Sequence, residues 1–241
     1  MSKQAGRMSQ GANDFLAPYA PTIGTASDVG TNRPYNNAAA SVTFTADPRN
    51  AATSYTVTSS PGSYTGTGSS SPVVVEGLAS DTAYTFVVTA TNSYGTSPAS
   101  SSSNSVTVTT VPATPSAPSA SSPSGTSYDT VTWSAPATGG KAITNYYWAS
   151  NDGKNGNTSG TSVNVNQEGG TSQTYTVRAD NANGSSGTSA ASGSVTTFSF
   201  VPFSVFGFSP FGVFGFSPFG VFSFSPFGVF GFSPFYPFRG V

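Results

Sequence analysis

The side chains that most often perform chemistry in enzymes are scarce in this chain of 241 residues, which contains no histidine and no cysteine. A Ser–His pair, a thiolate nucleophile, and zinc or haem sites built from these two residue types are therefore excluded. A Ser–Lys pair would need Lys3, Lys141 or Lys154, and no pattern supplies the third group that orients such a pair. We expect a protein that is not an enzyme and that needs no cofactor.

The acidic residues offer little more, because the nine of them are scattered along the chain. Asp129 and Asp180 are the ones that folding could bring near another acid, but solvated loop acids are the favoured interpretation. Residues 151–157 faintly resemble a calcium-binding loop, yet they lack its regular spacing and its terminal glutamate. Asp152-Gly153 and Asn155-Gly156 suit tight turns with positive φ. We therefore expect a hairpin and no bound metal.

The charge of the chain argues against a nucleic-acid partner, and its composition indicates where the protein is located. Charged residues make up 7% of the chain and the net charge is −1, so the chain lacks the cationic surface that a nucleic acid requires. Residues 1–14 contain no apolar run of the kind found in secretory signal peptides. The Ser- and Thr-rich remainder is nevertheless typical of surface-exposed β proteins. A virion location reconciles these two facts, and an extracellular or cell-surface location is the alternative.

Alternation of apolar and polar residues predicts short β-strands and no helix through most of the chain. In one run Tyr84, Phe86 and Val88 fall on the same face. Several short strands at close spacing indicate sandwiches. The predicted organisation is an N-terminal arm at 1–19, a first sandwich at 20–111, a proline-rich linker at 112–118, a second sandwich at 119–197, and a Phe-rich segment at 198–241.

Residues 77–97 resemble the region from strand E to strand G of a fibronectin type III domain. A Gly-Leu pair precedes the corner, and Tyr84 sits where that family has its corner tyrosine. In the second module Trp133 matches the strand B tryptophan, and Tyr175 opens a similar strand F pattern without the Gly-Leu pair. The resemblance implies an all-β fold with two tandem fibronectin type III-like sandwiches. It also implies that Tyr84 and Tyr175 are structural corner residues and that Phe44 and Trp133 lie in the cores.

Three consecutive aromatic residues occur in the second module, at Tyr146, Tyr147 and Trp148. Because side chains alternate along a strand, we expect two of them to fill the core and Tyr147 to face outward. An outward aromatic ring can stack on a sugar, so a host cell-surface glycan is a candidate partner.

The C-terminal segment repeats the octapeptide Ser-Pro-Phe-Gly-Val-Phe-Gly-Phe, as in residues 209–216. Proline at this frequency argues against a membrane-spanning helix. Ser-Pro-Phe-Gly suits a type I turn, and the rest suits a short extended piece. Both faces of that piece are apolar, so a lone chain cannot cover them. Several chains winding together, as in trimeric viral fibre shafts, or a groove on another protein could do so. The expected assembly residues are Phe206, Phe208, Phe211, Phe214, Phe216, Phe219, Phe222, Phe224, Phe227, Phe230, Phe232 and Phe235.

The resemblance implies a structural accessory protein of a phage virion, either a capsid decoration or a tail or fibre component, since such domains recur in phage surface proteins. Its expected partners are other copies of itself, in a homo-oligomer such as a trimer, and other virion proteins. One alternative is a bacterial cell-surface or secreted adhesin or carbohydrate-associated module. In another alternative the Phe-rich segment is membrane-active.

Overall fold

The computed structural model describes residues 16–198, in which β-strands are joined by turns and loops and no α-helix occurs. The all-β fold class is therefore confirmed. By its internal contacts the chain divides into two units, Met1–Phe200 and Val201–Val241, and the first unit contains both sandwich modules. All of the phenylalanines predicted to drive assembly lie outside the described residues.

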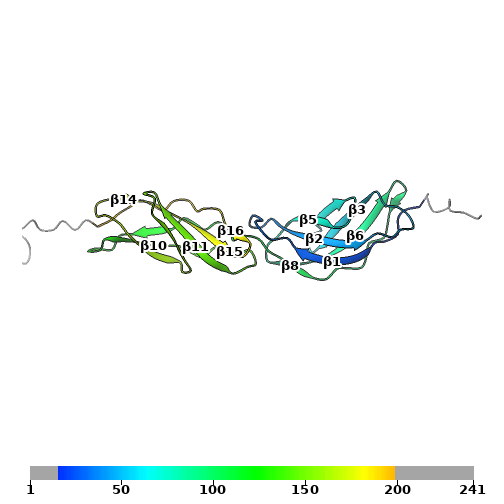
Figure 1. Cartoon of the computed structure of the whole chain (residues 1–241), viewed down its shortest axis with the longest axis horizontal. Coiled ribbons are helices and arrows are strands. Elements are labelled where there is room, and N and C mark those ends of the chain that lie inside the picture. The colour runs from blue at the N-terminus through cyan, green and yellow to red at the C-terminus, as the bar shows by residue number, and fades with distance from the viewer. Residues whose placement is uncertain (1–15, 199–241) are drawn as a thin grey trace, which may run out of the picture. The chain divides into compact units, whose positions relative to one another are not determined.

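The first module consists of two antiparallel sheets that face each other (Figure 1). One sheet has the order β1-β2-β5, and the other has the order β4-β3-β6-β7, with β8 also paired to β6. The strands are β1 (Thr22–Asp28), β2 (Ala38–Thr45), β3 (Ser54–Ser60), β4 (Thr65–Gly68), β5 (Val73–Leu78), β6 (Thr82–Asn92), β7 (Gly95–Thr96) and β8 (Val106–Val108).

The second module repeats this plan with sheets of order β13-β10-β9 and β12-β11-β15-β16, and it adds a short β14-β17 pair. Its strands are β9 (Ser119–Ser121), β10 (Tyr128–Thr132), β11 (Ile143–Ser150), β12 (Asn155–Thr158), β13 (Ser162–Asn166), β14 (Ser172–Gln173), β15 (Tyr175–Asn181), β16 (Gly184–Ser185) and β17 (Val195–Thr196). Strand by strand, this order matches the first module, and both modules are fibronectin type III-like sandwiches.

Each core lies between the two sheets of its module because the period-two pattern turns one apolar face inward. On β6, Tyr84, Phe86 and Val88 are 2%, 1% and 0% exposed. On β15, Tyr175 and Val177 are 0% and 1% exposed. Full burial of such a side chain contributes roughly 1.5–3 kcal/mol. These alternating residues therefore determine which side of each strand points into the core.

Serine at every third position attaches an irregular segment to the edge of β6. The backbone N–H groups of Ser97, Ser100 and Ser103 donate to carbonyl groups of β6. In return, their Oγ atoms accept the N–H groups of Ala90, Val88 and Phe86 at 2.9, 3.0 and 3.0 Å. Each serine thus makes a two-way contact with one residue of β6. We call this arrangement the serine ladder.

The second module has the same serine ladder on β15. Ser186, Ser189 and Ser192 pair in this way with Ala179, Val177 and Tyr175. Along each ladder, the irregular segment advances by three residues for every two residues of the strand, which amounts to a repeated β-bulge. The ladder satisfies the outer hydrogen-bonding groups of β6 and β15 and so closes an edge that would otherwise be open to another strand.

The structure departs from the sequence-based expectation at the hairpin between β11 and β12. Asp152-Gly153 does form the turn, with a φ of 91° at Gly153. Asn155-Gly156, however, opens β12 instead of forming a second turn. The reason is packing: a Cβ added to Gly156 would lie 2.9 Å from Cζ2 of Trp148. This glycine makes room for an indole ring, not for a positive φ.

Candidate functional site

A fully buried carboxylate lies in the second module, which corrects the expectation that the acids are solvated. Asp129, on β10, is 0% exposed. Its Oδ2 accepts a hydrogen bond from the hydroxyl of Tyr175 at 2.7 Å, and its Oδ1 accepts one from Oγ1 of Thr197 at 3.1 Å. Sequence patterning missed this role because a buried acid in a strand has no signature of its own.

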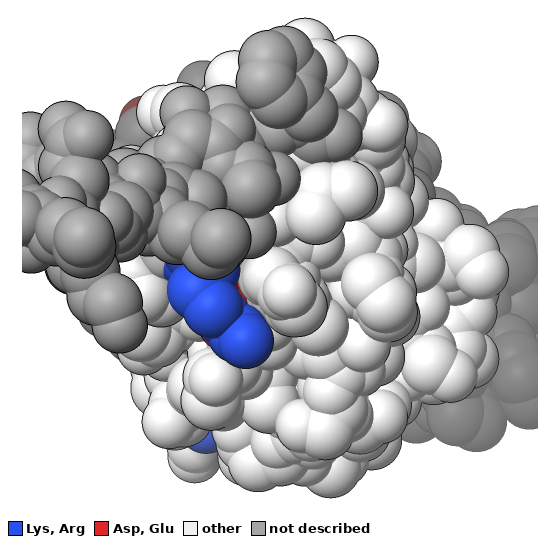
Figure 2. Space-filling model, turned by 90° about the vertical axis from the view of Figure 1, so that its right-hand side faces the viewer, with Lys and Arg blue, Asp and Glu red and all other residues white. Residues whose placement is uncertain are grey.

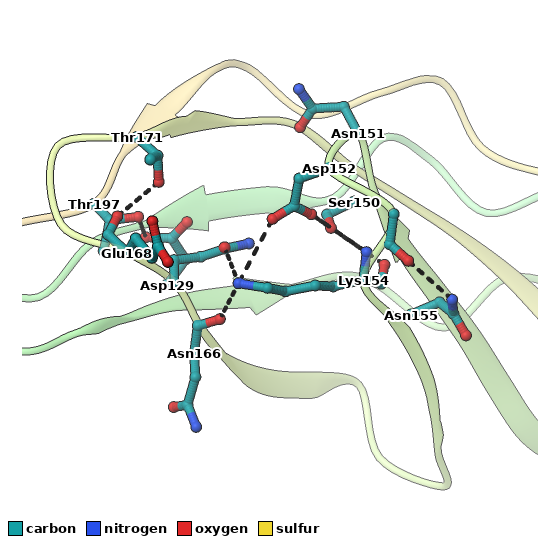
Figure 3. Close-up of polar contacts among 12 residues, drawn as sticks. Asp129, Ser150, Asn151, Asp152, Lys154, Asn155, Asn166, Glu168, Thr171 and Thr197 are labelled. Atoms are coloured by element: carbon teal, nitrogen blue, oxygen red, sulfur yellow. Dashed lines mark hydrogen bonds and ion pairs between the residues drawn. The ribbon is translucent and has the colours of Figure 1, made fainter.

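This carboxylate begins a chain of polar groups that reaches the surface at Lys154. Figure 3 shows the contacts around Lys154. Gln167 donates from Nε2 to the Tyr175 hydroxyl at 3.0 Å and accepts from Nζ of Lys154 at 2.5 Å. The ammonium group also donates to the Asn166 carbonyl at 2.8 Å and pairs with Asp152 at 3.6 Å. Three acceptors thus surround a group that carries three donors.

The electrostatics of this network follow from its burial and its hydrogen bonds. Burial raises the pKa of Tyr175 well above its usual value, and the hydrogen bond to Asp129 raises it further. At the surface, the hydrogen bond from Ser150 lowers the pKa of Asp152. The pKa shifts therefore favour a neutral Tyr175 inside the module and an ionised Asp152 at its surface.

The network is built to hold side chains in place, because each of its central groups is already engaged with another. Within residues 16–198, no group of three or more acidic residues is placed to bind a metal ion. The same stretch has no helix with the length and apolarity needed to cross a bilayer. An open pocket of about 490 Å³ lies elsewhere, lined by Tyr35, Pro112 and Ser186 among others, and it contains no charged side chain.

The last residues before the Phe-rich segment are fixed to this end of the second module. Thr197 is 1% exposed. Its backbone N–H donates to the Thr171 carbonyl, and its own carbonyl accepts from the N–H of Gly170, both at 2.9 Å. Together with the bond to Asp129, these contacts clamp Thr197 (Figure 3). We refer to Asp129, Gly170, Thr171 and Thr197 as the exit clamp.

The two tyrosines predicted as corner residues differ in what they contact. The hydroxyl of Tyr84 accepts a hydrogen bond from the backbone N–H of Ala79, in the loop before β6, at 3.1 Å. The hydroxyl of Tyr175 instead contacts the side chains of Asp129 and Gln167. The second module lacks the Gly-Leu turn that presents a backbone N–H, and a buried carboxylate takes its place.

The two residues predicted for the cores lie where their modules bury aromatic rings. Phe44 is 7% exposed, and its ring centroid lies 4.7 Å from that of Tyr55. Trp133 is 8% exposed and lies 5.6 Å from Tyr146. Each pair joins the two sheets of one sandwich.

Two asparagines connect the modules within the first unit. Asn181 donates from Nδ2 to the carbonyls of Thr110 and Thr138, at 2.9 and 2.8 Å. Asn183 donates to Oγ1 of Thr109 at 2.7 Å. Since Thr109 and Thr110 follow β8, the bonds to these two residues tie the end of the first module to the turn between β15 and β16. The sequence Asn-Ala-Asn-Gly at 181–184 indicates a turn. Its composition does not distinguish a turn that contacts another module from an ordinary hairpin turn.

The described part of the N-terminal arm rests on the other end of the first module. The carbonyls of Leu16 and Ala17 accept hydrogen bonds from Asn92 and Asn50, at 2.9 and 3.0 Å. The guanidinium of Arg49 lies 3.8 Å from the ring centroid of Tyr19. Figure 2, which faces this end, shows few charged side chains among uncharged ones.

Similar solved structures are tandem-domain proteins. The chicken contactin 1 FN1–FN3 domains are 18% identical, with a TM-score of 0.45 over 76% of this chain and 67% of that one. Domains A168–A170 of titin are 20% identical, with a TM-score of 0.41 over 74% of this chain and 67% of that one. No protein-family model and no curated protein matches the chain.

Proposed function

We propose that this chain is a non-catalytic display protein on the outside of a phage virion, in which the Phe-rich segment is the anchor and the two sandwiches face the solvent. The observation that carries the proposal is the exit clamp. Thr197 is buried and hydrogen-bonded to Gly170, Thr171 and Asp129 immediately before the Phe-rich segment begins. The residue before that segment is therefore tied to β10 and to the loop between β13 and β14.

The positions of the chain ends support the same function. On β6, Asn92 holds the N-terminal arm, whereas Asp81, just before the strand, lies beside Gly140 of the second module. On β15, Tyr175 lies at the exit clamp and Asn181 lies at the contact between the modules. The described residues thus end at the end of the second module that is remote from the first module.

Burial explains why the anchor is the Phe-rich segment and not the sandwiches. Fully burying a phenylalanine contributes roughly 1.5–3 kcal/mol, and ordering its backbone costs about 1–2 kcal/mol per residue. A surplus arises only where several chains, or a chain and a groove, share the apolar surface. The outer faces of the sandwiches are instead rich in Ser and Thr, and only 7% of the chain is charged.

Oligomeric state tests the anchor. The full chain and a chain ending at Thr197, which keeps the exit clamp, are compared by sedimentation velocity. We expect a multimer for the former and a monomer for the latter. A chain that begins at Leu16 and keeps the Phe-rich segment is the matched control and should stay multimeric. A multimeric chain ending at Thr197 would contradict the proposal and point to the sandwiches.

Mass spectrometry of purified virions from the strain that carries the gene tests the location. We expect the full chain in the particles and the chain ending at Thr197 to be absent from them. If the protein is found on the cell surface and not in virions, the adhesin alternative replaces the virion.

A further inference from the structure

The sheet of the second module that contains β11 and β15 carries an unusual set of side chains on its solvent side. Tyr146 points into the core and is 4% exposed, so its neighbour Tyr147 points outward. Tyr147 is paired with Asn157 on β12 and with Arg178 on β15, and Asn145 is paired with Asp180. We call Asn145, Tyr147, Asn157, Arg178 and Asp180 the planar patch, because each side chain ends in a flat group.

The members of the planar patch hold one another in place through contacts between their side chains. The Arg178 guanidinium lies 4.7 Å from the Tyr147 ring centroid, and its Nε lies 3.5 Å from Oδ1 of Asp180. Nδ2 of Asn145 donates to Oδ1 of Asn157 at 3.1 Å. Within residues 16–198, Nε of Arg178 and Oδ1 of Asp180 are buried atoms that make no hydrogen bond. The two atoms face each other in this ion pair, which fixes the Arg178 guanidinium beside the Tyr147 ring.

The first module provides an internal comparison for this face. Tyr55 pairs with Ala90 there as Tyr146 pairs with Ala179 here, and this fixes the correspondence of the strands. In the positions of Asn145, Tyr147, Asn157, Arg178 and Asp180, the first module has Ser54, Thr56, Thr67, Thr89 and Thr91.

Ser and Thr are what an exposed β face needs for folding alone, since threonine fits a pleated and solvated surface well. The second module has the same fold but replaces every one of these hydroxyl residues with a flat side chain. Folding therefore does not require the planar patch. A ligand-binding role explains why all five positions differ together.

The chemistry of the planar patch selects the class of ligand. Carboxylate, carboxamide and guanidinium groups can each bond two neighbouring hydroxyl groups at once. A tyrosine–arginine stack offers a flat surface to the C–H face of a sugar ring. Arg178 and Asp180 offset each other in charge, so the patch has no net attraction for a polyanion. A protein partner would favour a more apolar centre.

We propose that the planar patch binds an uncharged polysaccharide laid across β12, β11 and β15. Tyr147 and Arg178 form the platform, and Asn145, Asn157 and Asp180 bond the hydroxyl groups. An open sheet face suits an extended polymer better than a small molecule, which needs an enclosing cavity. This site belongs to the second module alone and does not depend on the function of the Phe-rich segment.

The test uses the full chain on an array of neutral and acidic glycans. In the swap variant, the five residues of the planar patch become those of the first module: Asn145→Ser, Tyr147→Thr, Asn157→Thr, Arg178→Thr and Asp180→Thr. The first module shows that its residues are compatible with this sheet, and tryptophan emission checks the fold. We expect binding to neutral glycans that falls at least about tenfold in the swap variant.

Single substitutions of Tyr147 distinguish stacking of its ring on a sugar from a role of the ring in stabilising the fold. Tyr147→Phe should keep binding within about threefold, whereas Tyr147→Thr should lose about tenfold. Thr56→Ser in the first module is the matched control and should change nothing. The proposal is overturned if the full chain binds no neutral glycan, if it binds acidic glycans alone, or if the swap variant binds as well as the original.

Discussion

Thr197 donates a hydrogen bond from Oγ1 to Oδ1 of Asp129 at 3.1 Å, across a sequence separation of 68 residues. Both residues are buried, at 1% and 0% exposed. The contact joins the end of the second sandwich to one of its inner strands, at the point where the Phe-rich segment begins.

Replacing Asp129 with alanine should destabilise the second module by about 1–3 kcal/mol, because the buried hydroxyls of Tyr175 and Thr197 lose their acceptor. Urea unfolding followed by tryptophan emission measures this directly, since both tryptophans of the chain, Trp133 and Trp148, lie in the second module. Thr132→Ala, at an exposed position of β10, is the control. An unchanged midpoint for Asp129→Ala would show that the hydrogen bonds to the Asp129 side chain contribute nothing to stability.

Replacing Ser189 with alanine should cost about 1–3 kcal/mol, because the backbone N–H of Val177 loses the Oγ acceptor inside the module. The same tryptophan assay applies. Thr188→Ala removes a hydroxyl from an exposed neighbour and should shift the midpoint little. Equal effects of the two changes would argue against a structural role for the serine ladder.

Replacing Tyr84 with phenylalanine should cost about 1 kcal/mol in the first module, because the N–H of Ala79 loses its partner. Thermal unfolding of the chain ending at Thr197, followed by far-UV circular dichroism, detects the loss. Tyr64→Phe serves as a control, since Tyr64 is 37% exposed. No difference between the two variants would count against a corner role for Tyr84.

Alkaline pH should weaken the second module through Tyr175. Its pKa is raised in the folded state, chiefly by burial, so above about pH 10 the unfolded chain releases a proton that the folded chain keeps. The contribution of Tyr175 is complete below that pH and is lost as pH rises, with a slope of up to about 1.4 kcal/mol per pH unit. Burial raises the pKa of Tyr146 as well.

Urea unfolding between pH 9 and pH 11, again by tryptophan emission, checks this sign. Tyr175→Phe should be less stable at neutral pH but should show a shallower alkaline loss, with the remainder due to Tyr146. A slope that Tyr175→Phe leaves unchanged would mean that other groups govern the alkaline transition.

Much of the fold could be predicted from the sequence by itself. Alternation such as Tyr84, Phe86 and Val88 sets which face of a strand is buried, because successive side chains point to opposite sides and only one side can be covered. The same local logic predicted that Tyr147 points away from the core. Absence of histidine and cysteine limited the chemistry for an equally local reason.

Contacts between distant residues were decided only by the tertiary structure. In the sequence, nothing distinguishes Asp129 from the other acidic residues. Its role follows from its hydrogen bonds with Tyr175 and Thr197, which are distant in the chain. The sequence predicts a loop for the serines after β6 and β15, because their spacing of three residues matches neither a strand nor a helix. Their role appears only when the neighbouring strand offers its N–H groups. The planar patch likewise required the register of three strands, since residues at 145, 157 and 178 become neighbours only through hydrogen bonds between strands.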